Sequence, residues 1–150
     1  MADRLPDAPA LNEWRDFRRQ AMDLHKILIV EDSELLHRMY DLIFITFRQN
    51  GGDIVHSYNG KEAISALTGN PDTDLILLDT NMPVMGGIEF LDYRKEHDFF
   101  QDIPTIIVST EGKESDTLRG LEAGAIAYVT KPFRPSDLHA LIRKTFQSPA

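Results

Sequence analysis

Short apolar runs alternate with amphipathic segments from residue 25 to the end of this 150-residue chain. No other sequence feature constrains the fold as strongly, because such alternation is typical of strand–helix repeats. Five runs have the length and composition of strands: residues 26–30, 53–57, 74–78, 105–108 and 125–129. The first, third and fourth are continuously apolar, as expected for parallel strands that helices cover on both faces.

The segments between the runs carry apolar side chains at helical spacing. The first has one stripe formed by Leu35, Leu36, Met39, Tyr40, Ile43 and Phe47. Further helices are expected from residue 61, over about 87–97, over about 113–123 with Gly124 as the stop, and from Pro135 to Phe146. Five such repeats predict an α/β fold, a doubly wound five-stranded parallel sheet with helices on both faces.

Residues 1–24 do not belong to this alternation. Apolar side chains at helical spacing predict a helix from about residue 11: Leu11, Trp14, Phe17, Ala21 and Leu24. We therefore expect an N-terminal extension, residues 1–24, before a domain that covers residues 25–150. Three interpretations of the extension stay open. It packs on the domain, it serves self-association or partner docking, or it is an unstructured arm or an expression remnant.

Composition excludes several classes of protein. The net charge of −8 disfavours direct binding of nucleic acid, whose phosphates would be repelled. No apolar run is long enough to span a bilayer and the start of the chain does not resemble a signal peptide, so we expect no membrane insertion and a cytoplasmic location. The absence of cysteine excludes disulfides and thiolate metal sites.

Polar residues follow the apolar runs at the edge where a doubly wound sheet binds its ligands. They are Glu31–Asp32 after the first run, Asp79–Thr80–Asn81–Met82–Pro83 after the third, Ser109–Thr110–Glu111 after the fourth and Lys131–Pro132 near the fifth. Three carboxylates at one edge repel one another unless a cation lies among them. Oxygen ligands without cysteine favour Mg²⁺. A carboxylate beside Mg²⁺ and a lysine is suited to phosphoryl transfer.

Each of these residues also has a plain structural interpretation when it is considered alone. An Asp after a strand is commonly a turn or helix-capping residue, Ser109 could cap the next helix, and Lys131 could be a solvated surface charge. Their occurrence together at successive strand ends favours a functional site.

These motifs resemble those of the receiver domain of two-component response regulators, including the single-domain chemotaxis type. The resemblance covers residues 25–146 and rests on Glu31–Asp32, Asp79–Pro83 with Gly86–Gly87, Ser109 and Lys131–Pro132–Phe133. It implies the flavodoxin-like strand order 2-1-3-4-5. It also implies a switch that accepts a phosphoryl group, with only self-catalysed phosphorylation and autodephosphorylation, rather than a dedicated enzyme.

The resemblance assigns a role to each matching residue. Asp79 would accept the phosphoryl group, and Lys131 would pair with a phosphoryl oxygen. The peptide bond between Lys131 and Pro132 would be cis. Asp32 would bind Mg²⁺ directly and Glu31 through a water of the metal. The Asn81 backbone carbonyl would be a further metal ligand. Ser109 would be the hydroxyl that moves toward the phosphoryl group, and Tyr128 the rotameric aromatic residue. Asn81 and Glu111 would influence hydrolysis of the acyl phosphate.

Three positions depart from the commonest family pattern. Glu31 stands where Asp is also common, Ser109 replaces the frequent Thr, and Thr110 follows where a small residue is usual. Thr110 is therefore a second candidate for the switch hydroxyl. The thirty-residue separation between Asp79 and Ser109 favours Ser109.

The resemblance also implies partners. The donor would be a histidine kinase, a phosphotransfer protein or a small phosphodonor. The output would be changed affinity for a downstream protein, or self-association, through the face of the fourth helix, fifth strand and fifth helix. The sequence leaves open whether the receiver acts alone or within a longer regulator.

Two other classes of protein stay open. An enzyme of the haloacid dehalogenase type would carry a second Asp two residues after its nucleophile, where this chain has Asn81. A receiver that no longer takes phosphate would be expected to lack Asp79, Asp32 or Lys131, and all three are present.

Overall fold

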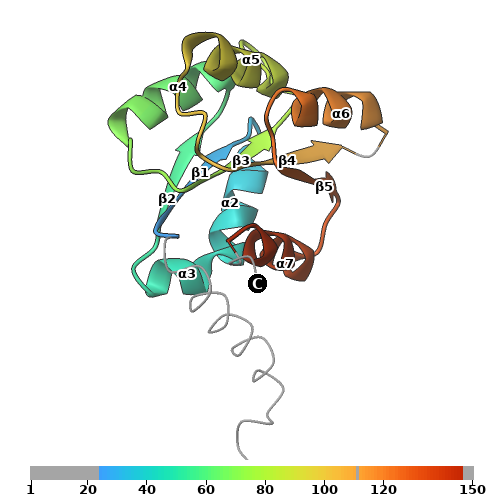
Figure 1. The fold of residues 1–150 in the computed structure, drawn as a ribbon. Coiled ribbons are helices and arrows are strands. Elements are labelled where there is room, and N and C mark those ends of the chain that lie inside the picture. Colours follow the sequence, from blue (N-terminus) through green and yellow to red (C-terminus); the bar gives the residue numbers. More distant parts are fainter. Residues whose placement is uncertain (1–23, 111, 147–150) are drawn as a thin grey trace, which may run out of the picture.

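The computed structural model describes residues 24–110 and 112–146, which form one parallel five-stranded sheet with flanking helices (Figure 1). The strands are β1 (Lys26–Val30), β2 (Asp53–Ser57), β3 (Leu75–Asp79), β4 (Thr105–Thr110) and β5 (Ala127–Lys131). Their order in the sheet is β2-β1-β3-β4-β5. The predicted fold class and strand order are confirmed.

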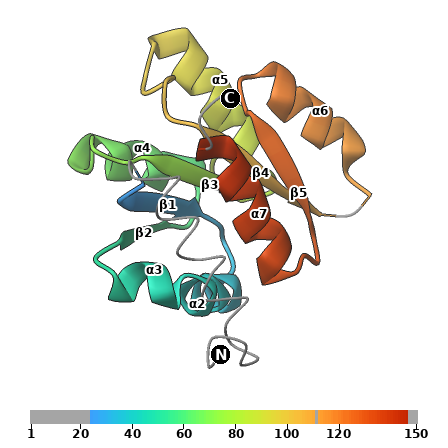
Figure 2. The same cartoon turned by 60° about the horizontal axis from the view of Figure 1, so that its bottom comes forward.

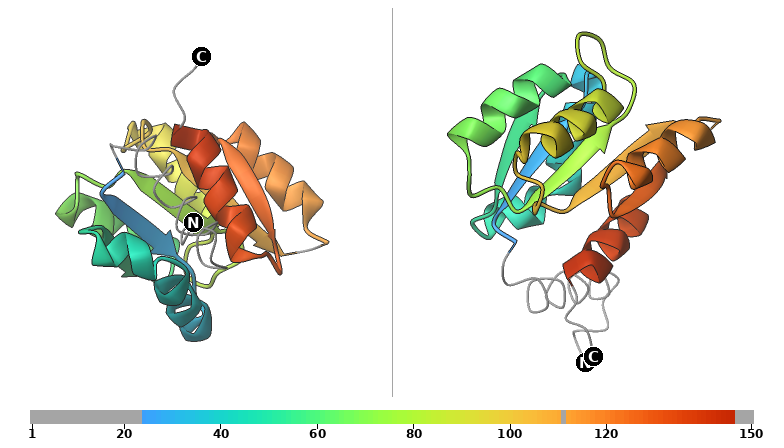
Figure 3. Two further views of the ribbon diagram at one scale, coloured as in Figure 1. Left: turned by 90° about the horizontal axis from the view of Figure 1, so that it is seen from below. Right: turned by 45° about the horizontal axis from the view of Figure 1, so that its top comes forward.

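Helices cover both faces of the sheet. They are α2 (Glu34–Ile43), α3 (Ile45–Gln49), α4 (Gly60–Gly69), α5 (Gly87–His97), α6 (Glu114–Glu122) and α7 (Pro135–Phe146). Helices α2, α3 and α7 share one apolar cluster on one face (Figure 2). Helices α4, α5 and α6 lie side by side on the other face (Figure 3).

The three central strands form the rigid frame of the molecule. Ile27, Leu28 and Ile29 of β1 are fully buried, and β3 and β4 are buried almost throughout. Each such side chain contributes about 1.5–3 kcal/mol when it leaves water. This burial explains the continuous apolar runs in the sequence, and it fixes the strand ends from which the polar side chains project.

Several strand boundaries differ from those predicted. Strand β5 begins two residues later than expected, because Gly124 has a φ of 119° and prolongs the turn after α6. Strand β5 therefore ends with Lys131, paired in register with Thr110. Likewise, Asp79 is the last residue of β3, and β4 extends to Thr110. Asp79, Ser109 and Lys131 are therefore held by strand pairing rather than by loops.

The predicted first helix is divided in two. Helix α2 ends at Ile43 and α3 begins at Ile45, with Phe44 between them in a non-helical conformation. Phe44 is 1% exposed and packs in the core, four residues after the buried Tyr40. The prediction that Leu35 and Met39 belong to the inward stripe is wrong, since they are 67% and 45% exposed.

The predicted N-terminal helix lies outside the described residues, apart from Leu24. Leu24 is 6% exposed and packs with the apolar cluster of α2 and α7. Within residues 24–110 and 112–146, no helix is long and apolar enough to cross a membrane.

Gly87 and Gly69 provide a matched pair of substitutions that tests the contact between α5 and β3. A Cβ at Gly87 would lie 2.3 Å from the Asp79 carbonyl oxygen, whereas a Cβ at Gly69 meets nothing within 4 Å. We expect Gly87→Ala to lower the free energy of unfolding by about 1–3 kcal/mol. Gly69→Ala should leave it unchanged or raise it by up to about 1 kcal/mol. Urea denaturation measures both, and a Gly87→Ala protein as stable as wild type would contradict the packing described.

Candidate functional site

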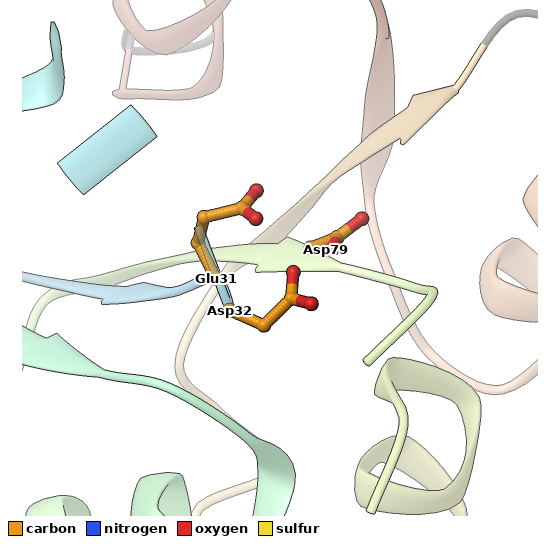
Figure 4. A group of neighbouring side chains, drawn as sticks. All are labelled: Glu31, Asp32 and Asp79. Atoms are coloured by element: carbon orange, nitrogen blue, oxygen red, sulfur yellow. The ribbon is translucent and has the colours of Figure 1, made fainter. Parts of the chain in front are cut away.

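The predicted acidic residues meet at the carboxyl ends of β1 and β3. Glu31 and Asp32 directly follow β1, and Asp79 ends the neighbouring strand β3 (Figure 4). The Glu31 backbone N–H donates to the Ser57 carbonyl at 3.0 Å, which continues the pairing of β1 with β2 past the end of the strand. Ser33 then begins α2 as its N-cap and accepts a hydrogen bond from the Leu36 N–H.

Glu31, Asp32 and Asp79 each place a carboxylate oxygen within 4.8 Å of the others. Glu31 and Asp79 are only 2% and 4% exposed, so water screens little of their mutual repulsion. Among the described residues, Oδ1 of Asp79 is buried without a hydrogen-bond partner. A buried acceptor of this kind is costly unless a cation or donor reaches it, so the cluster fits a hard divalent cation.

Lys131 is the positive charge at this site in the structure. Its Nζ lies 2.9 Å from Oε1 of Glu31 and 3.6 Å from Oδ1 of Asp79. The ammonium group therefore hydrogen-bonds Glu31 and forms a longer ion pair with Asp79, beyond hydrogen-bond distance. One ammonium group cannot neutralise three carboxylates, so a net negative site remains.

The electrostatics of the cluster appear in its pKa values. Burial raises the pKa of Glu31 to about 7, aided by the nearby Asp79 charge and opposed by the hydrogen bond from Lys131. Burial also raises the pKa of Asp79, while Lys131 and the backbone of Asn81 lower it. Both shifts mean that the folded chain resists full ionisation of this cluster unless further positive charge is supplied.

Ser109 lies in β4, next to the strand that carries Asp79, and it is 2% exposed. Its hydroxyl accepts a hydrogen bond from Oγ1 of Thr117 in α6 at 3.1 Å. Both residues line a cavity of about 390 Å³ together with Tyr128, which is 51% exposed. Thr110 is exposed, so burial beside α6 distinguishes Ser109 as the switch hydroxyl candidate.

The remaining predicted residues are Pro132, Asn81 and Glu111. The Lys131–Pro132 peptide bond is cis, as the resemblance implies. The Asn81 side chain is exposed just beyond Asp79. Glu111 lies outside the described residues.

Sequence reasoning missed one residue at this site, His37. Its ring is 2% exposed, and Nε2 lies 2.6 Å from the carbonyl oxygen of Glu31. His37 lies three residues before the buried Tyr40, so helical spacing places it on the inward face of α2, but spacing alone does not reveal its contact with the Glu31 carbonyl. The contact depends on the loop path between β1 and α2, which no local pattern reveals.

Comparison with known proteins identifies the family. The family model for the response regulator receiver domain matches residues 27–143. This chain belongs to the response regulator receiver domain family. The match includes every residue of the acidic cluster, together with Ser109 and Lys131.

Curated relatives include regulators of two sizes. The chain is 38% identical over 118 residues to the phosphate regulon transcriptional regulatory protein PhoB of Escherichia coli (strain K12), covering 79% of this chain and 50% of that protein. The chain thus spans about half the length of the PhoB proteins it matches. It is also 35% identical to a chemotaxis protein CheY homolog of Campylobacter jejuni, over 75% of this chain and 85% of that protein.

Solved structures show the same fold. The chemotaxis protein CheY4 of Vibrio cholerae aligns with a TM-score of 0.70 at 26% identity, over 81% of this chain and 98% of that one. The signal receiver domain of a histidine kinase from Syntrophus aciditrophicus aligns with a TM-score of 0.70 at 30% identity, over 81% of this chain and 89% of that one. Receiver domains are generally phospho-accepting switches of two-component signalling and typically bind Mg²⁺ at an acidic pocket.

The raised pKa of Glu31 predicts how stability depends on pH without a metal. Between about pH 4.5 and 7, the folded protein keeps a proton on Glu31 that the unfolded chain has released. The free energy of unfolding should therefore fall as pH rises through this range, by roughly 3 kcal/mol in total. Urea denaturation in EDTA at several pH values measures this fall.

Two controls accompany the pH series. Glu31→Gln removes the titrating group, so most of the slope should disappear. Saturating Mg²⁺ near pH 7.5 should raise the stability of the wild type, because the cation binds only the folded cluster. A flat profile for the metal-free wild type would contradict the burial described for Glu31.

Proposed function

We propose that Asp79 accepts a phosphoryl group from a histidine kinase, a phosphotransfer protein or a small phosphodonor, with Mg²⁺ bound at the acidic cluster. The buried Oδ1 of Asp79 carries this proposal, because it has no hydrogen-bond partner among the described residues and lies beside the Lys131 ammonium group. A carboxylate oxygen held in this way is available for bonding and has a positive charge beside it.

The residues that would hold Mg²⁺ are the three clustered carboxylates and the backbone carbonyl of Asn81. Their hard oxygen atoms match the ligands that Mg²⁺ prefers, and the few protein ligands leave room for phosphoryl oxygens. When bound, the cation would neutralise charge on the transferred group. Proton loss from Glu31, whose pKa is raised to about 7, would accompany binding.

In the transfer step, one Asp79 carboxylate oxygen attacks the phosphorus atom of the donor. A P–O bond to Asp79 forms, and the bond from phosphorus to the donor's nitrogen or oxygen breaks. The leaving group keeps that electron pair and takes up a proton where it needs one. Lys131 pairs with a phosphoryl oxygen, for which its ammonium group turns away from Oε1 of Glu31.

The switch follows from the surroundings of Ser109. A phosphoryl group on Asp79 adds nearly two negative charges and strong acceptor oxygens. The Ser109 hydroxyl then donates to the phosphoryl group, moves toward it and leaves Thr117. Tyr128 already borders the cavity beside both residues, so its half-exposed ring turns into the space that Ser109 vacates. The negative charge added at Asp79 thus shifts Ser109 and Tyr128 from one conformation to another.

The output surface is the face of α6, β5 and α7. Three large apolar side chains are more than half exposed on or beside these elements: Leu118, Ile126 and Tyr128. Rotation of Tyr128 would change this apolar surface, and with it the affinity for a downstream protein or for a second copy of the chain. Asn81 and Glu111, two residues after Asp79 and Ser109 in the sequence, are proposed to tune hydrolysis of the acyl phosphate.

Asp79→Asn tests the phosphoacceptor. Wild-type protein incubated with acetyl phosphate and Mg²⁺ should gain the mass of one phosphoryl group, because Asp79 is buried beside Lys131 and its Oδ1 has no hydrogen-bond partner among the described residues. Asp79→Asn should gain none, since an amide is no nucleophile. Asp92→Asn, the same change at an exposed position of α5, is the matched control and should react like wild type. Intact-protein mass spectrometry gives the readout, and modification of Asp79→Asn at the wild-type level would overturn the assignment.

Ser109→Ala separates phosphorylation from the switch. This variant should still bind beryllofluoride at Asp79, but the ring resonances of Tyr128 should no longer shift, because no hydroxyl moves toward the acceptor. Ser109→Thr keeps the hydroxyl and should retain the shift. NMR spectra of tyrosine rings with and without beryllofluoride and Mg²⁺ measure this. A wild-type response of Tyr128 in Ser109→Ala would rule out the coupling.

A further inference from the structure

A chain of polar side chains connects α2 and β2 to the metal-binding loop. His37 in α2 places Nε2 2.6 Å from the Glu31 carbonyl oxygen. Its Nδ1 is in hydrogen-bond contact with Nδ1 of His56 in β2. Nε2 of His56 lies 3.0 Å from Oδ1 of Asp41, one turn further along α2. The ring of His37 also packs against the Tyr58 ring in a tilted arrangement, with centroids 4.2 Å apart.

The two ends of this series of side chains, a backbone carbonyl and a carboxylate, determine which ring nitrogens donate. A backbone carbonyl only accepts, so Nε2 of His37 must carry the proton. In the neutral ring, Nδ1 of His37 is then an acceptor, and Nδ1 of His56 must donate to it. The Asp41 carboxylate also only accepts, so Nε2 of His56 donates there. His56 thus donates from both ring nitrogens, to the Asp41 carboxylate on one side and to His37 on the other, and His37 donates in turn to the Glu31 carbonyl.

Both backbone polar groups of Glu31 are therefore fixed. Its N–H donates to the Ser57 carbonyl at 3.0 Å, and its carbonyl accepts from His37. The carbonyl belongs to the peptide bond between Glu31 and Asp32, so its orientation sets where both carboxylates point. Because His37 is only 2% exposed, water cannot replace its hydrogen bond to the Glu31 carbonyl.

We propose that His37 is a positioning residue for the cation site: oriented by His56 and Asp41, it holds the Glu31–Asp32 peptide so that both carboxylates face Asp79. The inference rests on the proposed Mg²⁺ site and adds residues that touch neither the metal nor the phosphoryl group. Partners that orient metal ligands commonly change metal affinity by about 10–100-fold when they are removed.

The hydrogen bond itself can be tested without metal. In NMR spectra that correlate imidazole nitrogens with ring protons, His37 of the metal-free protein should show a protonated Nε2 and an unprotonated Nδ1. The opposite tautomer would remove the bond to the Glu31 carbonyl and overturn the proposal.

Substitutions test the consequence for the metal. His37→Leu fills similar space without a donor and should weaken Mg²⁺ binding by about tenfold or more. His37→Gln offers an amide N–H near the position of Nε2 and should stay close to wild type. Tyr58→Phe, the control, keeps the ring on His37 and loses only the hydroxyl bond to Glu34, so Mg²⁺ affinity should not change. Mg²⁺ titration followed by amide NMR shifts gives the affinities, and urea denaturation verifies that each variant is folded.

The outcomes separate this inference from the proposed function. Suppose that the wild type binds Mg²⁺ and takes a phosphoryl group from acetyl phosphate. If His37→Leu then binds Mg²⁺ equally well, only the proposed role of His37 is overturned. Equal losses in His37→Gln and His37→Leu, each in proportion to lost stability, would show a purely structural residue and also overturn it. Wild type that binds no Mg²⁺ overturns the proposed function.

Discussion

The repulsion among Glu31, Asp32 and Asp79 is the constraint on which the site depends. Their oxygens lie within 4.8 Å of one another, and Glu31 and Asp79 are almost fully buried. In such surroundings like charges are costly, and Lys131 offsets only part of that cost. The pKa values of Glu31 and Asp79 are raised because these negative charges are buried and only partly compensated. A cation bound among the three carboxylates would offset this negative charge, and Lys131 would pair with an oxygen of the phosphoryl group that Asp79 is proposed to accept.

The sheet is what keeps the repelling groups together. Strands β1, β3 and β4 are apolar on both faces, and their burial supplies the free energy that holds a strained polar edge. Asp79 and Lys131 are terminal residues of paired strands, and Ser109 lies within one. Glu31 and Asp32 lie in the loop after β1, and two anchors hold this loop in place, the hydrogen bond to β2 and the ring of His37.

Much of this could be predicted from the sequence, because the fold depends on local patterns. The apolar runs locate all five strands, and the rule that ligands bind beyond strand ends places Glu31, Asp32 and Asp79 together. What could not be predicted depends on three-dimensional packing. The break at Phe44, the exposure of Leu35 and the start of β5 at Ala127 are set by which side chains the core can hold. His37 was missed for the same reason, since its partner is a backbone carbonyl that no side-chain pattern marks.

The most direct measurement of the central claim is a crystal structure of the protein with Mg²⁺ and beryllofluoride. The account predicts beryllium bonded to a carboxylate oxygen of Asp79, Mg²⁺ ligated by Asp32, Asp79 and the Asn81 carbonyl, and Lys131 moved from Glu31 to a fluoride. An adduct on another residue, or a cluster that takes up neither group at saturating concentrations, would contradict it.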